Sequence, residues 1–268
     1  MNGHDQQKEL VREHFTRTAQ VFGDYALASR VGEAERLAQM VGAGGDDRAV
    51  DIACGPGTLA LRFARHVRWI CGLDLTPAIL KRARRSAVEE NLRNLAFAIG
   101  DAHALPFADG SLDIAVTSYS LHHMSDPARV IGEMARVVKR GGRAGVVDIF
   151  VPEDRQAAAL NNRIEQIRDA SHTRTLARSE FENIFERHGL RISDTHSESQ
   201  AHAFDHWMLV AGLKPGDTRY QEARKLMEQS IPDDGAEFHP RFERTAANDR
   251  ELVFDNTMLF IAGEKIGR

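Results

Sequence analysis

A short apolar stretch that runs into a glycine turn constrains the fold of this chain more than any other feature. Residues 49–58 read Ala-Val-Asp-Ile-Ala-Cys-Gly-Pro-Gly-Thr. Gly55 and Gly57 allow the backbone to turn sharply after a buried strand and to approach a ligand closely, where a Cβ atom would obstruct it. Thr58 is a suitable N-cap for a helix that continues to about His66. This order of strand, glycine turn and helix predicts the start of a doubly wound α/β domain.

Apolar strands and helical patterns alternate through the first half of the chain. We expect further strands at residues 69–74, 95–99, 112–118 and 143–150. Helical periodicity covers about 77–91 and 127–139 between them. Alternation of this kind predicts a parallel sheet with helices on both of its faces.

The second half of the chain is less regular. We expect late strands at 190–197 and 253–261, and helical insertions at about 151–178 and 199–250. A connection as long as the second insertion is usually functional, or part of a lid, rather than a plain loop.

Two helical patterns precede the first strand. They cover about residues 8–22 and 26–41, with a glycine-rich end after the second. We expect residues 1–42 to form a helical lid segment and residues 43–268 to form the main domain.

The composition limits the class of protein. The chain has 268 residues, 42% of them hydrophobic, and no apolar run approaches the ~20 residues that a membrane span needs. A formal net charge of −4 argues against a general nucleic-acid surface. The first residues contain no apolar signal segment, and Cys54 and Cys71 are the only cysteines. We therefore expect a globular protein of the cytoplasm, without membrane insertion, a disulfide framework or a metal site.

Three acidic residues follow the predicted strand ends. Asp51 lies in the first strand, Asp74 ends the second and Asp101 follows the third. In a parallel sheet these carboxyl ends line one crevice, where ligands of this architecture bind. Asp74 follows Gly57 at close to the spacing of about 20 residues at which an acid meets a ribose diol. The sequence therefore predicts a nucleoside-containing cofactor.

Asp51 helps to distinguish two such cofactors. Residues 55–60, Gly-Pro-Gly-Thr-Leu-Ala, also satisfy the Gly-x-Gly-x-x-Gly/Ala pattern of dinucleotide sites. A carboxylate in the preceding strand would work against a pyrophosphate at the helix N-terminus. It would favour the positive charges of S-adenosylmethionine. An NAD-dependent oxidoreductase remains an alternative at this point.

The ordered motifs point to a known family. They are Asp51-x-Ala53-x-Gly55-x-Gly57, Gly72-Leu-Asp74-Leu-Thr-Pro, Gly100-Asp101-Ala102 with Leu105-Pro-Phe, Leu121-His-His, and Glu133-x-x-Arg136-Val-Val-Lys-x-Gly141-Gly. With them the chain resembles the class I S-adenosylmethionine-dependent methyltransferases, and most closely the small-molecule branch that includes the ubiquinone/menaquinone biosynthesis methyltransferases. Ala53 departs from the pattern, because the family most often has glycine there.

The resemblance implies a fold and a cofactor site. The fold is a doubly wound, seven-stranded, mostly parallel α/β sheet of the Rossmann-like methyltransferase type, in which the last strand is antiparallel. Asp74 would bind the ribose hydroxyls and Leu75 would lie against adenine, while Asp101 and the backbone of Ala102 would bind the adenine amino group. The methionine part would lie on the glycine turn, and the residues implied there are Asp51, Ala53, Gly55, Gly57 and, facing the reacting methyl group, Ser118.

The acceptor is less defined by the sequence. The resemblance implies methyl transfer to carbon or oxygen of a small organic molecule, and a base is needed only if the acceptor is a hydroxyl or an acidic carbon. We take His123 as the candidate catalytic residue. Candidate substrate-pocket residues are Phe15, Phe22, Tyr25, Tyr119, His172 and His206.

Other readings of the site stay open or are disfavoured. A fold that binds the cofactor without transferring methyl is an alternative to the methyltransferase. After the fourth strand the chain reads Ser-Tyr-Ser-Leu-His-His rather than the Asn/Asp-Pro-Pro-aromatic turn of amino-methylating enzymes that act on DNA, which argues against nucleic acid as the acceptor. His202 and His206 are four residues apart on an expected helix but have no clear third metal ligand, so we expect no metal.

Overall fold

An eight-stranded sheet forms the centre of the protein. In the computed structural model, which describes residues 3–245 and 248–267, the strand order is β3-β2-β1-β4-β5-β8-β6, and β7 pairs with β8. Neighbouring strands from β3 to β5 are parallel, whereas β8 is antiparallel to β5, β6 and β7. The strands are β1 (Arg48–Ile52), β2 (Trp69–Asp74), β3 (Leu95–Ile99), β4 (Leu112–Ser118), β5 (Val138–Ile149), β6 (Leu190–Ala203), β7 (Arg241–Arg244) and β8 (Arg250–Lys265).

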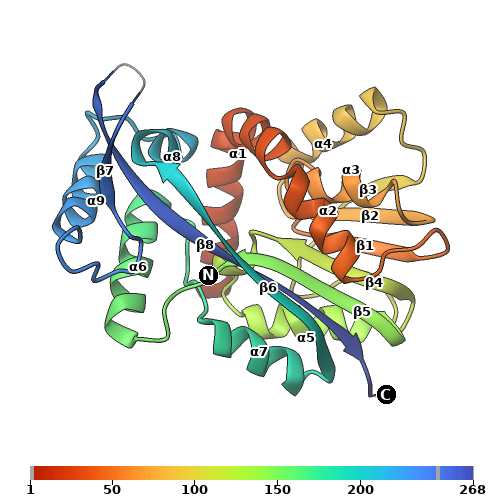
Figure 1. The fold of residues 1–268 in the computed structure, drawn as a ribbon. Coiled ribbons are helices and arrows are strands. Elements are labelled where there is room, and N and C mark those ends of the chain that lie inside the picture. The colour runs from red at the N-terminus through yellow and green to blue at the C-terminus, as the bar shows by residue number, and fades with distance from the viewer. Residues whose placement is uncertain (1–2, 246–247, 268) are drawn as a thin grey trace.

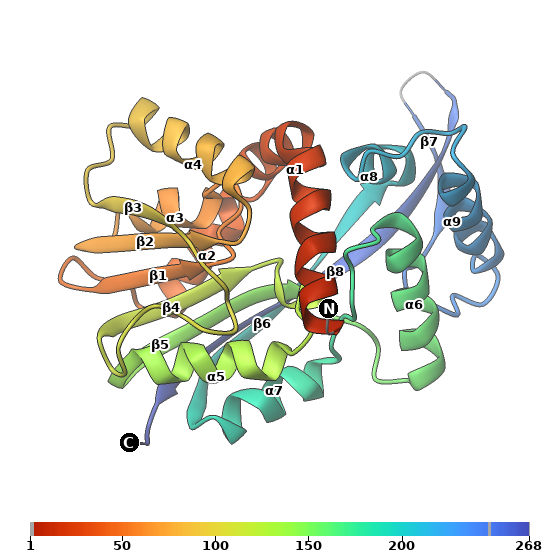
Figure 2. The same ribbon diagram turned by 180° about the vertical axis from the view of Figure 1, so that it is seen from behind.

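Helices cover both faces of this sheet (Figures 1 and 2). Buried side chains of α5 and α7 pack on one face, and those of α2 and α3 pack on the other. The helices are α1 (Gly3–Ser29), α2 (Val31–Met40), α3 (Thr58–Phe63), α4 (Pro77–Glu89), α5 (Pro127–Val137), α6 (Arg155–Arg168), α7 (Arg178–Arg187), α8 (Phe204–Val210), α9 (Thr218–Gln229) and the 3-10 turn η1 (Leu121–His123). The predicted doubly wound α/β fold is confirmed. Within the described residues, no helix is both long and apolar enough to cross a membrane.

A second group of elements lies beyond the end of the central sheet. The far part of β8 packs with α6, α8 and α9 in a separate hydrophobic cluster built around Phe204, Trp207, Phe238 and Phe254. In both views α1 lies between this group and the half of the sheet formed by β1, β2 and β3 (Figures 1 and 2). This position places α1 over the carboxyl ends of the parallel strands.

The late strands are longer than the sequence pattern predicts. β6 has 14 residues and β8 has 16, and β7 is a short strand that the pattern did not indicate. The additional residues of β6 are mostly polar and largely exposed, so they lack the buried alternation on which strand prediction depends. β6 pairs with β8 along almost the whole length of β6, and this pairing provides the backbone hydrogen bonds that extend the strand.

The N-terminal helices also break at a different position. The pattern predicted a break after residue 22, but α1 continues to Ser29 and the helical backbone is interrupted at Arg30, with φ −103° and ψ 18°. Gly23 therefore lies inside a helix. A Cβ atom there would come within 2.6 Å of the Arg82 side chain of α4, so the glycine serves close packing between α1 and α4 rather than a helix end.

Candidate functional site

Three residues with left-handed backbone form the turn after β1. Ala53 has φ 53°, Gly55 has φ 53° and Gly57 has φ 87°. A Cβ atom on Gly55 would lie in ordinary van der Waals contact with Phe22 at 3.8 Å and Ile79 at 3.9 Å, and Gly55 lines a cavity. Ala53 carries the strain that a glycine would avoid. The predicted glycine turn is therefore present, and its tightest residues are in the conformation that glycine favours.

Asp51 lies behind this turn rather than in front of it. Its side chain is completely buried, and its Oδ2 accepts a hydrogen bond of 2.9 Å from the Ala60 backbone N–H in α3. The other carboxyl oxygen, Oδ1, has no hydrogen-bond partner among the described residues. Burial raises the pKa of Asp51 well above its usual value. In this structure Asp51 thus ties β1 to α3.

Asp74 connects the end of β2 to the same turn. Its Oδ2 accepts a hydrogen bond from the Gly55 N–H at 2.9 Å, and its Oδ1 accepts one from the Thr76 N–H at 2.8 Å. Burial raises the pKa of Asp74, because the backbone hydrogen bonds only partly offset the loss of solvent. Each carboxyl oxygen retains lone-pair capacity for a further donor.

Asp101 lies at the end of β3, where α1 covers it. Its Oδ2 is 2.7 Å from Nζ of Lys8, and its Oδ1 accepts a hydrogen bond of 2.9 Å from the His103 N–H. Burial alone would raise the pKa of Asp101, but the bonds from Lys8 and His103 outweigh it and lower the pKa to about 2. Asp101 is therefore a carboxylate at neutral pH.

These residues line a first cavity beneath α1. It encloses about 900 Å³ of empty space, including its open mouth. Most of the predicted cofactor residues contribute to its wall, namely Ala53, Gly55, Asp74, Leu75, Asp101, Ala102 and Ser118. Four predicted acceptor-site residues lie in the same wall, namely Phe15, Phe22, Tyr119 and His123. Asp51 and Gly57 are not part of this wall.

A second cavity adjoins the first. It encloses about 750 Å³ and is lined by the other predicted pocket residues, Tyr25, His172 and His206. Several of the residues that line this cavity have ionisable side chains. Among them, Glu165 and Arg168 lie on α6, and Asp169 directly follows that helix. Four residues, Phe22, Arg30, Tyr119 and His123, line both cavities and form the wall between them. All the predicted pocket residues thus surround two neighbouring spaces.

Tyr119 is the strained residue of the shared wall. It follows β4 with φ 49°, a conformation that a bulky residue rarely adopts without a surrounding constraint. The Arg30 guanidinium lies 3.7 Å from the centre of its ring, and its hydroxyl contacts Met258 of β8. Burial raises the pKa of Tyr119 well above its usual value. Tyr119 is thus held in place from α1, α2 and β8.

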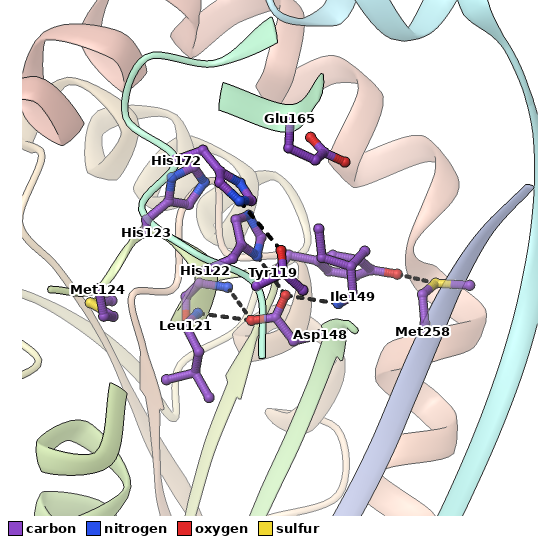
Figure 3. Close-up of polar contacts among 12 residues, drawn as sticks. Tyr119, Leu121, His122, His123, Met124, Asp148, Ile149, Glu165, His172 and Met258 are labelled. Carbon is purple, nitrogen blue, oxygen red and sulfur yellow. Dashed lines mark hydrogen bonds and ion pairs between the residues drawn. The ribbon is translucent and has the colours of Figure 1, made fainter. Parts of the chain in front are cut away.

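A buried histidine and aspartate pair faces the second cavity. Nδ1 of His122 is 2.6 Å from Oδ1 of Asp148, and Asp148 is only 1% exposed. The other Asp148 oxygen accepts hydrogen bonds from the Ser120 and Leu121 N–H groups, at 3.1 and 2.8 Å. Figure 3 shows the Asp148 carboxylate against the backbone of Leu121. Sequence reasoning overlooked this pair, although Asp148 is a further acid near the end of a parallel strand.

The three clustered histidines differ in charge. The His122 ring centre is 4.2 Å from that of His123 and 5.4 Å from that of His172. Figure 3 shows the three rings next to one another. Burial would lower the pKa of His122, but Asp148 outweighs it and raises the pKa. Burial and the neighbouring His122 lower the pKa of His123 to about 3 and that of His172 to about 2. His122 is therefore the member that binds a proton most readily.

His202 and His206, the pair considered above as possible metal ligands, do not lie on one helix. His202 belongs to β6, and only His206 lies in α8, because β6 extends further than predicted. Within the described part of the chain, His4, Asp101 and His103 form the one group of three side chains with donor atoms close enough for a metal ion. Lys8 already pairs with Asp101 there, and its charge would oppose a cation.

Comparison with known proteins identifies the class. The family model described as "Methyltransferase domain" matches residues 50–146, which include the end of β1 and most of the cavity-lining strand ends. The chain is also 30% identical to an uncharacterized methyltransferase, YcgJ of Bacillus subtilis, over 77% of this chain and 81% of that protein. The chain belongs to this methyltransferase family, and the predicted family resemblance is confirmed.

Three particular proteins show how far the similarity extends. The crystal structure of YcgJ matches with a TM-score of 0.79 and 28% identity, covering 88% of this chain and 99% of that one. The ubiquinone/menaquinone biosynthesis C-methyltransferase UbiE of Bdellovibrio bacteriovorus is 29% identical over 55% of this chain and 65% of its own length. A structure of geranyl diphosphate C-methyltransferase from Streptomyces coelicolor with S-adenosyl-L-homocysteine shares the fold, with a TM-score of 0.58, 18% identity and coverage of 87% and 78%.

Proposed function

We propose that this methyltransferase transfers the methyl group of S-adenosylmethionine to carbon or oxygen of a small organic acceptor. The observation that carries the proposal is the pair of cavities separated by a wall of four residues, Phe22, Arg30, Tyr119 and His123. The first cavity has the acids and the glycine turn that a nucleoside cofactor needs. The second adjoins it and is lined by both aromatic and ionisable side chains, which could hold a small acceptor.

The residues of the first cavity fit S-adenosylmethionine. Asp74, with lone pairs left on both oxygens, would bind the ribose hydroxyls next to the turn. Asp101, an ionised carboxylate, would accept the adenine amino group once Lys8 moves aside or shares it. Leu75 and Ala102 provide apolar contacts for the base, and Ser118 lies at the β4 end of the cavity. The complexes of the geranyl diphosphate methyltransferase show that this fold can hold the demethylated cofactor.

The chemistry follows from an activated methyl group. S-adenosylmethionine supplies a methyl on a sulfonium, so that an electron pair of the acceptor forms the new bond as the sulfur–methyl bond breaks and S-adenosylhomocysteine is released. The protein must hold the acceptor in line and exclude water. An acceptor hydroxyl or acidic carbon must also lose a proton, and we assign that proton to Nε2 of His122.

His122 suits this task better than His123. Asp148 holds its Nδ1 and raises its pKa, which makes His122 the stronger base. No hydrogen bond within the described residues uses its Nε2, and His122 lines the second cavity. His123 points its Nδ1 to the Ser171 carbonyl oxygen at 3.2 Å, and its low pKa makes it a weak base. A buried base of this kind favours a hydroxyl among the possible acceptors.

We also propose that the elements outside the sheet form a lid. α1, within residues 1–42, covers the first cavity through Gln7, Lys8 and Val11. Elements of the insertions 151–178 and 199–250 supply most of the second cavity's outer wall, among them α6 and α8. A lid that orders on ligand binding would keep water away from the acceptor during transfer.

Binding and turnover experiments test the two halves of this function separately. Calorimetry with S-adenosylmethionine, S-adenosylhomocysteine and NAD should show binding of the first two only. Incubation with methyl-labelled S-adenosylmethionine and a panel of phenols, hydroquinones and enolisable ketones should place the label in an ether or on a carbon. Binding of NAD alone would refute the cofactor. Product formation with intact cofactor would instead support a protein that binds the cofactor without transferring its methyl group.

A further inference from the structure

Arg30 holds an unpaired positive charge at the wall between the two cavities. It interrupts the helical backbone between α1 and α2, and its guanidinium packs over the Tyr119 ring at 3.7 Å and near Phe22 at 5.4 Å. Among the residues that the structure describes, it has no ion pair within 4.0 Å and no side-chain hydrogen bond. Burial raises the pKa of the nearby Glu33 carboxyl, although the charge of Arg30 acts to lower it.

The acidic and basic side chains of the first cavity lie in different parts of its wall. Asp74 and Asp101 lie at the ends of β2 and β3, where the nucleoside would bind. Lys8, the other lysine or arginine in the wall, is already paired with Asp101. The cavity thus has acids at its nucleoside end, and Arg30 is its unpaired cation within the described residues. A ligand that complements this arrangement of charges carries hydrogen-bond donors at one end and an anion at the other.

Three backbone N–H groups of the glycine turn already donate to other atoms of the protein. The Cys54 N–H donates to the Leu73 carbonyl at 3.0 Å, and the Gly57 N–H donates to the Cys54 carbonyl at 2.9 Å. The Gly55 N–H donates to Asp74, and Pro56 has no N–H. The Thr58 hydroxyl is without a partner, but it is uncharged. A carboxylate placed on this turn therefore finds these three donors used, and a side-chain cation would bind it more strongly than the remaining neutral groups.

We infer that Arg30 binds the α-carboxylate of the methionine part of S-adenosylmethionine. This rests on the proposed function, since it concerns recognition of the same cofactor. The guanidinium would form a charge-assisted, two-point hydrogen bond with the carboxylate. Its stacking on Tyr119 holds the side chain in position before the cofactor arrives. The carboxylate is also the group that distinguishes S-adenosylmethionine from its decarboxylated form.

A matched pair of ligands tests this assignment. Calorimetry would measure the affinity of S-adenosylmethionine and of decarboxylated S-adenosylmethionine, which keeps the sulfonium and the amine, for the full chain and for Arg30→Met. The substitution should weaken binding of S-adenosylmethionine by roughly 10- to 100-fold and change that of the decarboxylated ligand by no more than about twofold. The affinity of Arg30→Lys for S-adenosylmethionine should lie between that of the wild type and that of Arg30→Met.

Arg36→Met provides the control. Arg36 lies on α2, packs over the Phe260 ring at 5.7 Å, pairs with Glu198 at 3.7 Å, and lines neither cavity. The Arg36→Met variant should bind both ligands with the affinities of the wild type. An equal loss for both ligands in Arg30→Met, or no loss for either, would overturn the assignment while leaving the cofactor in place. A wild-type chain that binds neither ligand would refute the proposed function and this inference together.

Discussion

Replacing Asp148 with asparagine tests the buried pair in the second cavity. The Nδ1 of His122 and the Oδ1 of Asp148 are 2.6 Å apart, and Asp148 is 1% exposed, so solvent screens the pair little. A hydrogen bond to a charged group contributes about 1.5–3 kcal/mol. Because Asp148 is what raises the pKa of His122, we expect that pKa to fall in Asp148→Asn.

The same pair makes stability depend on pH with a definite sign. The pKa of His122 is raised in the folded state, so the folded protein binds this proton more tightly than the unfolded chain does. The resulting stability is fully present below the unfolded pKa of about 6.5 and is lost as the pH rises through the folded pKa. The free energy of unfolding of the wild type should therefore exceed that of Asp148→Asn most at about pH 5.5 and less at about pH 8.5.

Histidine NMR and urea unfolding measure these two effects without an acceptor. The Cε1–H resonance of His122 would be titrated in both proteins, with Asp154→Asn as the control. Asp154 caps α6 by accepting hydrogen bonds from Gln156 and Ala157, and asparagine is an equally good N-cap. An unchanged His122 titration in Asp148→Asn, or a stability difference that grows with pH, would refute the reasoning.

Three further predictions concern the first cavity. Asp74→Asn should weaken cofactor binding by on the order of 1–3 kcal/mol in calorimetry, because an amide cannot accept from Gly55, Thr76 and the ribose together; unchanged affinity would refute the ribose contact. Ala53→Gly should raise the free energy of unfolding, measured by urea unfolding, by about 1 kcal/mol, because glycine adopts a φ of 53° without strain. A lower free energy of unfolding would show that Ala53 is not strained. Lys8→Met should speed amide exchange at the start of α1 by up to about fivefold, as an ion pair this exposed contributes less than about 1 kcal/mol. Unaltered exchange would show that the pair does not hold α1 down.

The parts of the fold that depend on local patterns were predictable from sequence. The strand before Gly55, the left-handed turn and the alternation of strands and helices follow from apolar runs and glycine chemistry, which act over a few residues. The break at Arg30 does not. Gly23 signals a helix end locally, but packing against Arg82 of α4 keeps it helical, and no short-range pattern contains that contact.

In the site, too, some residues lie where local sequence predicts them and others depend on tertiary contacts. Asp74 and Asp101 line the cavity as their positions after β2 and β3 predicted. Asp51 is buried behind the turn, because alternation in β1 turns its side chain towards α3 and the Ala60 N–H. The choice between His122 and His123 depends on the 3-10 turn η1, which directs one ring to Asp148 and the other to Ser171. Two adjacent, identical residues carry no sequence signal that separates them.

The histidine cluster should titrate as a unit rather than as separate groups. A proton on His122 opposes protonation of its neighbours, which is one reason why the pKa values of His123 and His172 are low. Removing Asp148 takes away the charge that keeps the proton on His122. In Asp148→Asn the pKa of His172 should therefore rise while that of His122 falls, and one NMR titration records both. Movement of both in the same direction would mean that burial alone, not coupling to His122, sets the charge of the second cavity.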